Sequence, residues 1–271
     1  LERDVALKVL RDQSWRSEDA VRRFTLEARA ASHLKHPNTI RIFDFGASDD
    51  GVLFIAMELL EGLDVDALVA SSGRLPAARV IHLARQACAS LSEAHARGIV
   101  HRDIKPANLF VARVGGVLDM LKVLDFGVAR LQGPAHALTE EGTLFGTPDF
   151  MSPEMCGGEP IDARSDVYSL GASLHFMLTG ASLFPDRSVS EVIMMHISRM
   201  PEPPSTRAAV SADLDAVVMK CLAKSPVDRY ASVDELAVAL AACADAGRWS
   251  QVDAQAWWAE WRLGSPRLKA G

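Results

Sequence analysis

The chain has 271 residues, of which 49% are hydrophobic and 24% charged, and its formal net charge is −6. This composition is typical of a globular protein with a sizeable core, and it excludes collagen-like, coiled-coil, low-complexity and mainly disordered chains. The negative net charge is unlike that of nucleic-acid-binding domains, which are typically basic.

The chain up to residue 57 predicts a small β-rich unit with one helix. Residues 4–11 alternate with a period of two, which is typical of a strand. Residues 17–35 begin with Ser-Glu-Asp and contain no Gly or Pro, which predicts a helix. The apolar runs 40–45 and 52–58 flank a short stretch with two Gly and two Asp, and this pattern indicates a hairpin.

After Gly62 the pattern changes to helices. Apolar residues recur at helical spacing in two of these segments, and a capping box opens the last one. The segment 166–179 is apolar nearly all round, which predicts a helix in the middle of a core. The predicted helices cover 76–97, 166–179 and 214–222, and a further one begins at Ser232. We therefore expect a β-rich part at 1–57, a connector at 58–62 and a larger helical part at 63–246.

The tail from residue 247 to 271 holds four of the five tryptophans. At helical spacing they could form one apolar face, and we expect this face to pack on the helical part. A partner-binding or membrane-surface helix is the alternative. The four residues are Trp249, Trp257, Trp258 and Trp261.

The four cysteines lie far apart without a CxxC pair, which indicates free thiols in a reducing compartment. His33 and His36 have no acidic or cysteine companion nearby in the sequence, so a zinc site is not expected. The sequence contains no run of about 18 apolar residues, so no membrane span is predicted.

The strongest chemical pattern is the run HRDIKPAN at residues 101–108. Asp103 offers a carboxylate that can accept a hydroxyl proton, and Lys105 offers an ammonium that can neutralise phosphate charge. Asn108 offers a carbonyl oxygen to a hard cation such as Mg²⁺. Any one of these residues alone would fit a polar surface turn, but the whole set in this order does not.

Two further motifs follow downstream. Asp125 ends the apolar run 122–124 and precedes Phe-Gly, and a carboxylate at a strand end before a turn suits a metal ligand. The segment GTPDFMSPE at 146–154 ends on Glu154. Each of these motifs is weak alone, and their order after the first run makes them specific.

Together with Val5-Ala6-Leu7-Lys8, these motifs resemble the eukaryotic-like serine/threonine protein kinases, in particular their bacterial branch. The resemblance runs from residue 4 to about residue 245. It implies transfer of the ATP γ-phosphoryl group to Ser or Thr hydroxyls of protein substrates, with Mg²⁺ or Mn²⁺.

The fold implied by this resemblance is α+β and two-lobed. The small β-rich N-lobe would lack its first two strands, and the C-lobe would be larger and helical. The expected parts are the N-lobe at 1–57, the hinge at 58–62, the C-lobe at 63–246 and the Trp-rich tail at 247–271.

The resemblance also implies roles at the nucleotide. Lys8 would hold the α- and β-phosphates, with Glu27 as its ion-pair partner and Glu18 and Glu2 as further candidates. The remaining positions form the adenine and ribose site: Met57 as gatekeeper, the backbone of Glu58 and Leu60 on adenine, and Asp64 on the ribose.

For the chemical step, Asp103 would orient and deprotonate the substrate hydroxyl, and Lys105 would lie near the γ-phosphate. Asn108 and Asp125 would hold the metal ions. The Asp-x-Lys form of the loop resembles that of serine/threonine-specific kinases.

Two scaffold contacts are implied as well. Glu154 would pair with Arg229, and Asp166 would brace the catalytic loop from the central helix.

Regulation is indicated by Arg102, because an arginine beside the catalytic aspartate can clamp a phosphate on the segment between Asp125 and Glu154. Thr139 and Thr143 are the candidate sites, and we expect autophosphorylation at one of them, with two copies of the protein able to pair for the reaction in trans. Thr147 would bond the catalytic loop in the active state.

The chain begins seven residues before Lys8, without Met, so it does not hold the glycine-rich loop expected ahead of that lysine. We expect a fragment of a longer protein that binds ATP weakly and turns over below the roughly 1–100 s⁻¹ typical of kinases. The catalytic domain is expected in the cytoplasm, within a parent that could be membrane-anchored.

Two other functions fit parts of the pattern. A pseudokinase would only bind partners, but Lys8, Asp103, Asn108 and Asp125 are all present. A small-molecule phosphotransferase of the same fold would resemble His-Gly-Asp rather than His-Arg-Asp at 101–103.

Overall fold

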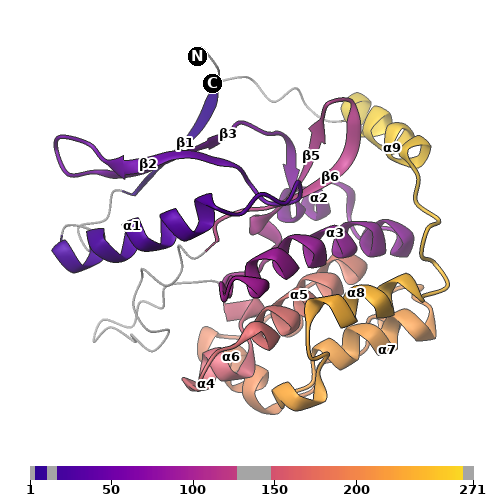
Figure 1. The fold of residues 1–271 in the computed structure, drawn as a ribbon. Coiled ribbons are helices and arrows are strands. Elements are labelled where there is room, and N and C mark those ends of the chain that lie inside the picture. The colour runs from indigo at the N-terminus through magenta and orange to yellow at the C-terminus, as the bar shows by residue number, and fades with distance from the viewer. Residues whose placement is uncertain (1–3, 11–16, 127–147, 265–271) are drawn as a thin grey trace.

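A computed structural model describes residues 4–10, 17–126 and 148–264. Figure 1 shows a small sheet flanked by one helix, a larger body of helices, and a second small sheet on the side of that body. Within the described residues, no helix is long and apolar enough to cross a membrane.

The N-terminal sheet has three antiparallel strands in the order β1-β3-β2, so that β1 lies at an edge. Lys8 lies opposite Ile55, on the inner face of β1. The outer face carries Val5, Leu7 and Val9, which are 41%, 59% and 36% exposed. The strands are β1 (Val5–Leu10), β2 (Ile42–Ala47) and β3 (Leu53–Glu58).

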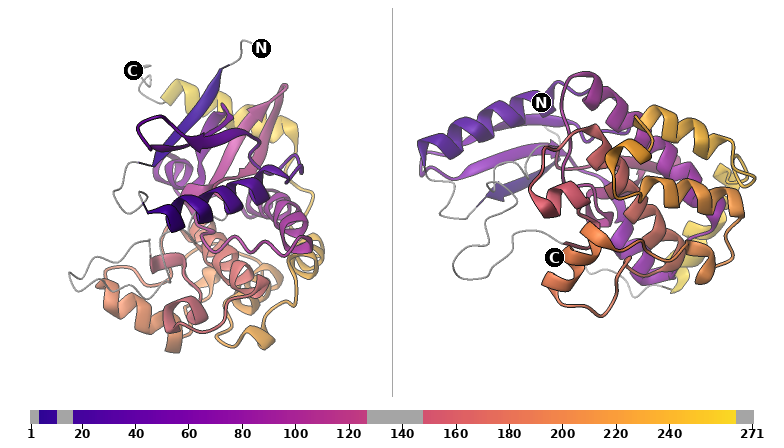
Figure 2. Two further views of the ribbon diagram at one scale, coloured as in Figure 1. Left: turned by 60° about the vertical axis from the view of Figure 1, so that its left-hand side comes forward. Right: turned by 90° about the horizontal axis from the view of Figure 1, so that it is seen from below.

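Helix α1 (Glu18–Ser32) packs against this sheet, as both views in Figure 2 show. It begins at Ser17, whose Oγ accepts a hydrogen bond from the Ala20 amide at 3.2 Å, a common N-cap. Phe24 and Ala28 are buried on the face turned toward Ile55 of β3. The helix ends three residues before the predicted limit, ahead of the segment His-Pro-Asn.

A second antiparallel sheet, with the order β4-β5-β6, begins at Glu61, within the predicted hinge. Of its strands, only the end of β6 was expected from the sequence. At Gly62 the backbone φ is 155°, and a Cβ atom there would lie 2.1 Å from the Val111 carbonyl oxygen. Only glycine therefore allows β4 to pack this closely on β5. The strands are β4 (Glu61–Asp64), β5 (Leu109–Val114) and β6 (Val117–Val123).

The helical body is built around α5, which is buried along nearly its whole length, as its sequence predicted. A Cβ atom on Gly171 would lie 2.5 Å from Cys221 Cβ, so glycine lets α5 and α7 approach closely. The helices of this part are α2 (Val65–Ser72), α3 (Ala77–Ala96), α4 (Pro153–Gly157), α5 (Ala163–Thr179), α6 (Val189–Ser198), α7 (Ala212–Cys221) and α8 (Val233–Ala241).

A buried ion pair ties α4 to the turn after α7. The Arg229 guanidinium donates to both oxygens of Glu154 at 2.7 and 2.8 Å, and the Ser165 hydroxyl donates to the same carboxylate at 2.6 Å. The two charged side chains are 0% and 3% exposed. Burial alone would raise the pKa of Glu154, but the bonds from Arg229 and Ser165 outweigh it and hold this pKa below its ordinary value.

The C-terminal helix α9 (Gln251–Gly264) docks on the helical body beside β6, as Figure 1 shows. Ala254 and Trp258 belong to the main hydrophobic core, with the other three tail tryptophans packed against it. The predicted docking of the Trp-rich tail is therefore confirmed.

Candidate active site

The catalytic loop holds the Asp103 carboxylate between a cation and an amide. Lys105 Nζ lies 2.9 Å from Asp103 Oδ2, and Asn108 Nδ2 donates to the same oxygen at 2.8 Å. Asn108 Nδ2 also donates to the Asp103 carbonyl oxygen at 2.8 Å. These bonds fix the Asn108 side chain and leave its amide oxygen as the atom that can bind a cation.

Asp166 of α5 holds this loop from below. Its carboxylate accepts hydrogen bonds from the backbone amides of His101 and Arg102 at 2.8 and 2.9 Å. His95 of α3, which the sequence did not single out, contacts the same carboxylate at 2.7 Å. Arg102 has a φ of 68°, in the left-handed region that non-glycine residues rarely adopt, and the contacts of Asp166 hold this strained loop in place.

His101 links the loop to the strand that leads to Asp125. The amide of Asp103 donates to Nδ1, so Nε2 carries the proton and donates to the Leu124 carbonyl oxygen at 2.7 Å. The Leu124 amide in turn donates to the Asn108 carbonyl oxygen at 2.9 Å. The structure therefore connects Asp103 and Asn108, by short hydrogen bonds, to the residue just before Asp125.

Lys8 reaches Asp125 across the two lobes. Lys8 Nζ lies 2.6 Å from Asp125 Oδ2, and the side chains are 34% and 24% exposed. Two opposite charges that are partly withdrawn from water stabilise each other. The pair of Lys8 with Glu27 stays a prediction.

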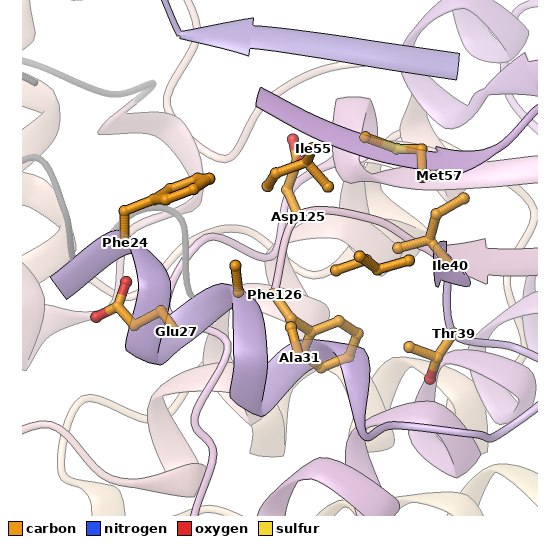
Figure 3. Close-up of a pocket in the computed structure, with 11 residues that line it drawn as sticks. Phe24, Glu27, Ala31, Thr39, Ile40, Ile55, Met57, Asp125 and Phe126 are labelled. Carbon is orange, nitrogen blue, oxygen red and sulfur yellow. The ribbon is translucent and has the colours of Figure 1, made fainter. Parts of the chain in front are cut away.

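Glu27 and Asp125 both line a small cavity between α1 and β3, as Figure 3 shows. The cavity measures about 20 Å³, which is room for about one water molecule and far too little for a nucleotide. Most of its lining is apolar and includes Met57, the residue expected as gatekeeper. Of the other candidates for pairing with Lys8, Glu18 begins α1 and Glu2 lies outside the described residues.

The hinge is anchored through Glu58. Its side chain accepts from Lys122 Nζ of β6 at 2.7 Å and from the Arg41 amide at 2.8 Å. Its own amide donates to the Arg41 carbonyl oxygen at 2.9 Å. A contact of the Glu58 backbone with adenine stays a prediction. Lys122 was not singled out from the sequence, because a lysine in a strand gives no sign of its partner.

Asp64 has a structural role that the sequence did not reveal. Its carboxylate caps α2 by accepting from the Ala67 amide at 2.7 Å. A contact of Asp64 with the ribose stays a prediction, as does the contact of the Leu60 backbone with adenine.

The regulatory residues are only partly described. Arg102 is half-buried, and its Nε atom has no hydrogen-bond partner among the residues that the structure covers. Thr139, Thr143 and Thr147 lie outside the described residues.

The donor set suits a magnesium ion shared with phosphate. No cluster of three or more His, Cys, Asp or Glu side chains that could hold a metal occurs in 4–10, 17–126 or 148–264. Mg²⁺ needs no such cluster, because it commonly binds one or two carboxylates together with waters and substrate phosphates. Asp125 and the amide oxygen of Asn108 offer ligands of this kind.

Comparisons with known proteins agree with this geometry. Residues 2–239 match the family model described as protein kinase domain. The chain is 40% identical over 242 residues to the serine/threonine-protein kinase pkn3 of Myxococcus xanthus, covering 86% of this chain and 44% of that protein. It is 39% identical over 240 residues to PknB of Mycobacterium leprae, covering 87% and 38%. The chain thus spans about two-fifths of the length of these curated relatives.

Solved structures show the same fold. The kinase domain of PknI from Mycobacterium tuberculosis matches with a TM-score of 0.67 and 28% identity, over 87% of this chain and 83% of that one. Rad53, solved in complex with AMP-PNP, matches with a TM-score of 0.70 over 86% and 56%. Its 23% identity supports the fold alone.

Proposed function

Because this chain belongs to the protein kinase family, as a catalytic domain of the bacterial serine/threonine type, we propose that the protein transfers the γ-phosphoryl group of ATP to Ser and Thr hydroxyls of protein substrates. The observation that carries this proposal is the hydrogen-bonded loop of Asp103, Lys105 and Asn108, joined through Leu124 to Asp125. Such catalysis depends mainly on positioning and on charge neutralisation.

In the proposed step, Asp103 accepts the proton of the substrate hydroxyl as the hydroxyl oxygen bonds to the γ-phosphorus. The bond between this phosphorus and the β,γ-bridging oxygen breaks, and ADP leaves with the electron pair. Lys105, already 2.9 Å from Asp103, lies where it can neutralise negative charge on the transferred group.

Lys8 and Asp125 would exchange their mutual contact for contacts with the nucleotide. Lys8 would hold the α- and β-phosphates, and Asp125 and Asn108 would hold Mg²⁺ or Mn²⁺. When bound, the ion neutralises charge on the phosphates. We propose that Glu27, on the helix that faces this site, forms an ion pair with Lys8 once the nucleotide is bound.

A labelling assay tests the proposed function. The protein, expressed from its complete gene, is incubated with Mg²⁺, ATP labelled at the γ-phosphate and a generic basic protein substrate. We expect label on phosphoserine and phosphothreonine. Label on small-molecule hydroxyls alone would favour a small-molecule phosphotransferase, and binding of ATP without any transfer would favour a pseudokinase.

Autophosphorylation is the proposed means of activation. A phosphate on Thr139 or Thr143 would carry nearly two negative charges and could be clamped by Arg102, whose half-buried guanidinium has Nε available in the described part of the chain. We expect mass spectrometry of the active protein to find phosphate on one of these threonines, and Thr139→Ala/Thr143→Ala to lower activity. Full activity with both threonines unmodified would contradict this proposal.

The proposed substrates and setting follow from the reaction. Protein segments bearing Ser or Thr are the acceptors, and a second copy of the protein is one such acceptor if it pairs for reaction in trans. Since the donor is ATP, we place the catalytic domain in the cytoplasm.

A further inference from the structure

The Trp-rich tail is tied to β6 through a buried charged cluster, which we call the tail cluster and define as Arg79, Asp119, Trp249 and Trp258. Arg79 of α3 donates to both oxygens of Asp119 at 2.8 Å. The indole N–H groups of Trp249 and Trp258 donate to the same carboxylate at 2.9 and 2.7 Å. Four donors thus converge on one carboxylate, and two of them come from the tail.

The tail cluster is withdrawn from water. The side chains of Arg79 and Asp119 are both 0% exposed. The ring of Trp257 stacks on the Arg79 guanidinium, with its centroid 4.0 Å from Cζ. Among the residues that the structure describes, Trp257 makes no hydrogen bond to Asp119. Removing any hydrogen-bond donor to a buried carboxylate destabilises the folded protein, because the free-energy cost of withdrawing the charge from water is then no longer offset.

Asp119 also sits at a strained point of β6. Its φ is 54°, in the left-handed region, where a residue other than glycine needs support from its surroundings. Next to it, Gln251 of α9 exchanges two hydrogen bonds with the backbone of Leu118, each at 2.9 Å. The tail therefore fixes both the backbone and the side chain at the start of β6.

The same strand carries two contacts of the candidate active site. Three residues after Asp119, Lys122 holds Glu58 of the hinge at 2.7 Å. Beyond the end of β6, Asp125 contacts Lys8 at 2.6 Å. Because a paired strand is stiff along its length, a change in position at Asp119 is passed on to the hinge and to the metal ligand.

The end of α9 touches the hinge side directly. Trp258 and Trp261 line a cavity of about 100 Å³ together with Glu61 and Gly62, which form the end of the predicted hinge and the start of β4. Trp261 Nε1 also donates to Ser71 Oγ of α2 at 3.3 Å. The tail thus contacts the nucleotide-binding region from two sides, at β6 and at β4.

We infer that α9 is a positioning element of the nucleotide site, and that Trp249 and Trp258 act as positioning residues through Asp119 and β6. This inference rests on the proposed function in one respect: the site that α9 positions is taken to be the nucleotide site. It gives the tail a role beyond stability: loss of its two indole bonds loosens the hinge and weakens nucleotide binding.

Three matched substitutions test the inference. Trp258→Phe and Trp249→Phe each remove one N–H donor to Asp119 and keep an aromatic ring. Trp257→Phe makes the same change on α9, which also carries Trp258, without removing a bond to Asp119. Hydrogen exchange of the nucleotide-free protein, followed by mass spectrometry, then reports local opening at residues 58–62 and 120–125.

We expect faster exchange in both segments for Trp258→Phe and Trp249→Phe, and exchange close to wild type for Trp257→Phe. Segments in α7 and α8 should not change in any variant. Faster exchange everywhere, or a lowered Tm with unchanged exchange at the hinge, would reduce the tail to a stabilising role and overturn the inference. Trp249→Phe still decides the question if Trp258→Phe does not fold, because Trp249 is the less buried of the two.

Binding of MgADP gives a second readout. We expect its Kd to rise about threefold to tenfold in Trp258→Phe relative to Trp257→Phe, since part of the energy of one charge-assisted hydrogen bond is passed to the site. Equal Kd values would contradict the inference. If the wild type bound no MgADP, the proposed function would be at fault, while the exchange experiment would still decide the role of the tail.

Discussion

Asp103→Asn is expected to lower kcat for phosphoryl transfer by a factor of at least about 100, because general-base catalysis contributes roughly 10² to 10⁴ to such rates. The amide of Asn is nearly the same size as the carboxylate but cannot accept the hydroxyl proton. Affinity for MgATP should change little, since the proposed ligands of the metal and the phosphates, Lys8, Asn108 and Asp125, are all retained. Steady-state kinetics with a protein substrate measures both parameters.

Asp66→Asn is the matched control, because Asp66 is an exposed acid in the first turn of α2 and has no hydrogen bond or ion pair to the described residues of the catalytic loop. It should keep wild-type kcat. A wild-type rate in Asp103→Asn would remove the proposed base from the mechanism. Unfolding curves of both variants check that the loss is chemical, since Asp103 is partly exposed and its replacement should cost little stability.

Arg229→Leu is expected to destabilise the fold by about 3–5 kcal/mol, because it leaves the buried Glu154 carboxylate without its cation. The guanidinium also donates to the carbonyl oxygens of Arg164, Ala223 and Lys224, so several acceptors lose a partner together. Urea unfolding at neutral pH measures the change from the transition midpoint.

Arg164→Leu provides the contrast. Arg164 pairs with Asp162 at 2.6 Å, but these side chains are 32% and 51% exposed, so the loss should stay within about 1 kcal/mol. Equal losses in Arg229→Leu and Arg164→Leu would show that burial of the Glu154 pair does not matter. Glu154→Leu/Arg229→Leu should recover part of the loss, because it removes both charges.

The pair also predicts a pH dependence. The folded-state pKa of Glu154 lies below its ordinary value of 4.5, so the unfolded chain binds the proton more readily. The stabilising contribution is therefore complete above pH 4.5 and is lost as pH falls through the lowered pKa of the folded state. The difference in stability between wild type and Arg229→Leu should narrow over that acid range.

The kinase fold and most residues of the candidate site could be predicted because they occur in short, ordered motifs. The run at 101–108 has one residue for each chemical task. Because Asp125 follows it at a fitting distance, the run is not an ordinary polar surface turn. The pair of Glu154 and Arg229 was predicted from the same order of motifs, and the structure confirms it. The central helix α5 was predicted because its apolar residues surround the helix.

What could not be predicted depends on contacts between distant parts of the chain. The strand β4 is four residues long and reads Glu-Gly-Leu-Asp, which has no β-propensity, so its pairing with β5 was invisible in the sequence. Asp119 looked like an ordinary polar residue in a strand, although it receives both tail indoles. The pair of Lys8 and Asp125 was also missed, because the two residues are 117 positions apart and the resemblance implied a different role for each of them.

The central claim is that Lys8, Asp103, Asn108 and Asp125 converge on the terminal phosphates of ATP and their metal ion. A crystal structure with a non-hydrolysable ATP analogue and Mn²⁺ tests it most directly, since anomalous scattering locates the ion. We predict an anomalous peak at the Asp125 carboxylate and the Asn108 amide oxygen, with the Lys8 ammonium moved from Asp125 to the phosphates. A peak elsewhere, with the 2.6 Å contact between Lys8 and Asp125 intact, would contradict the account.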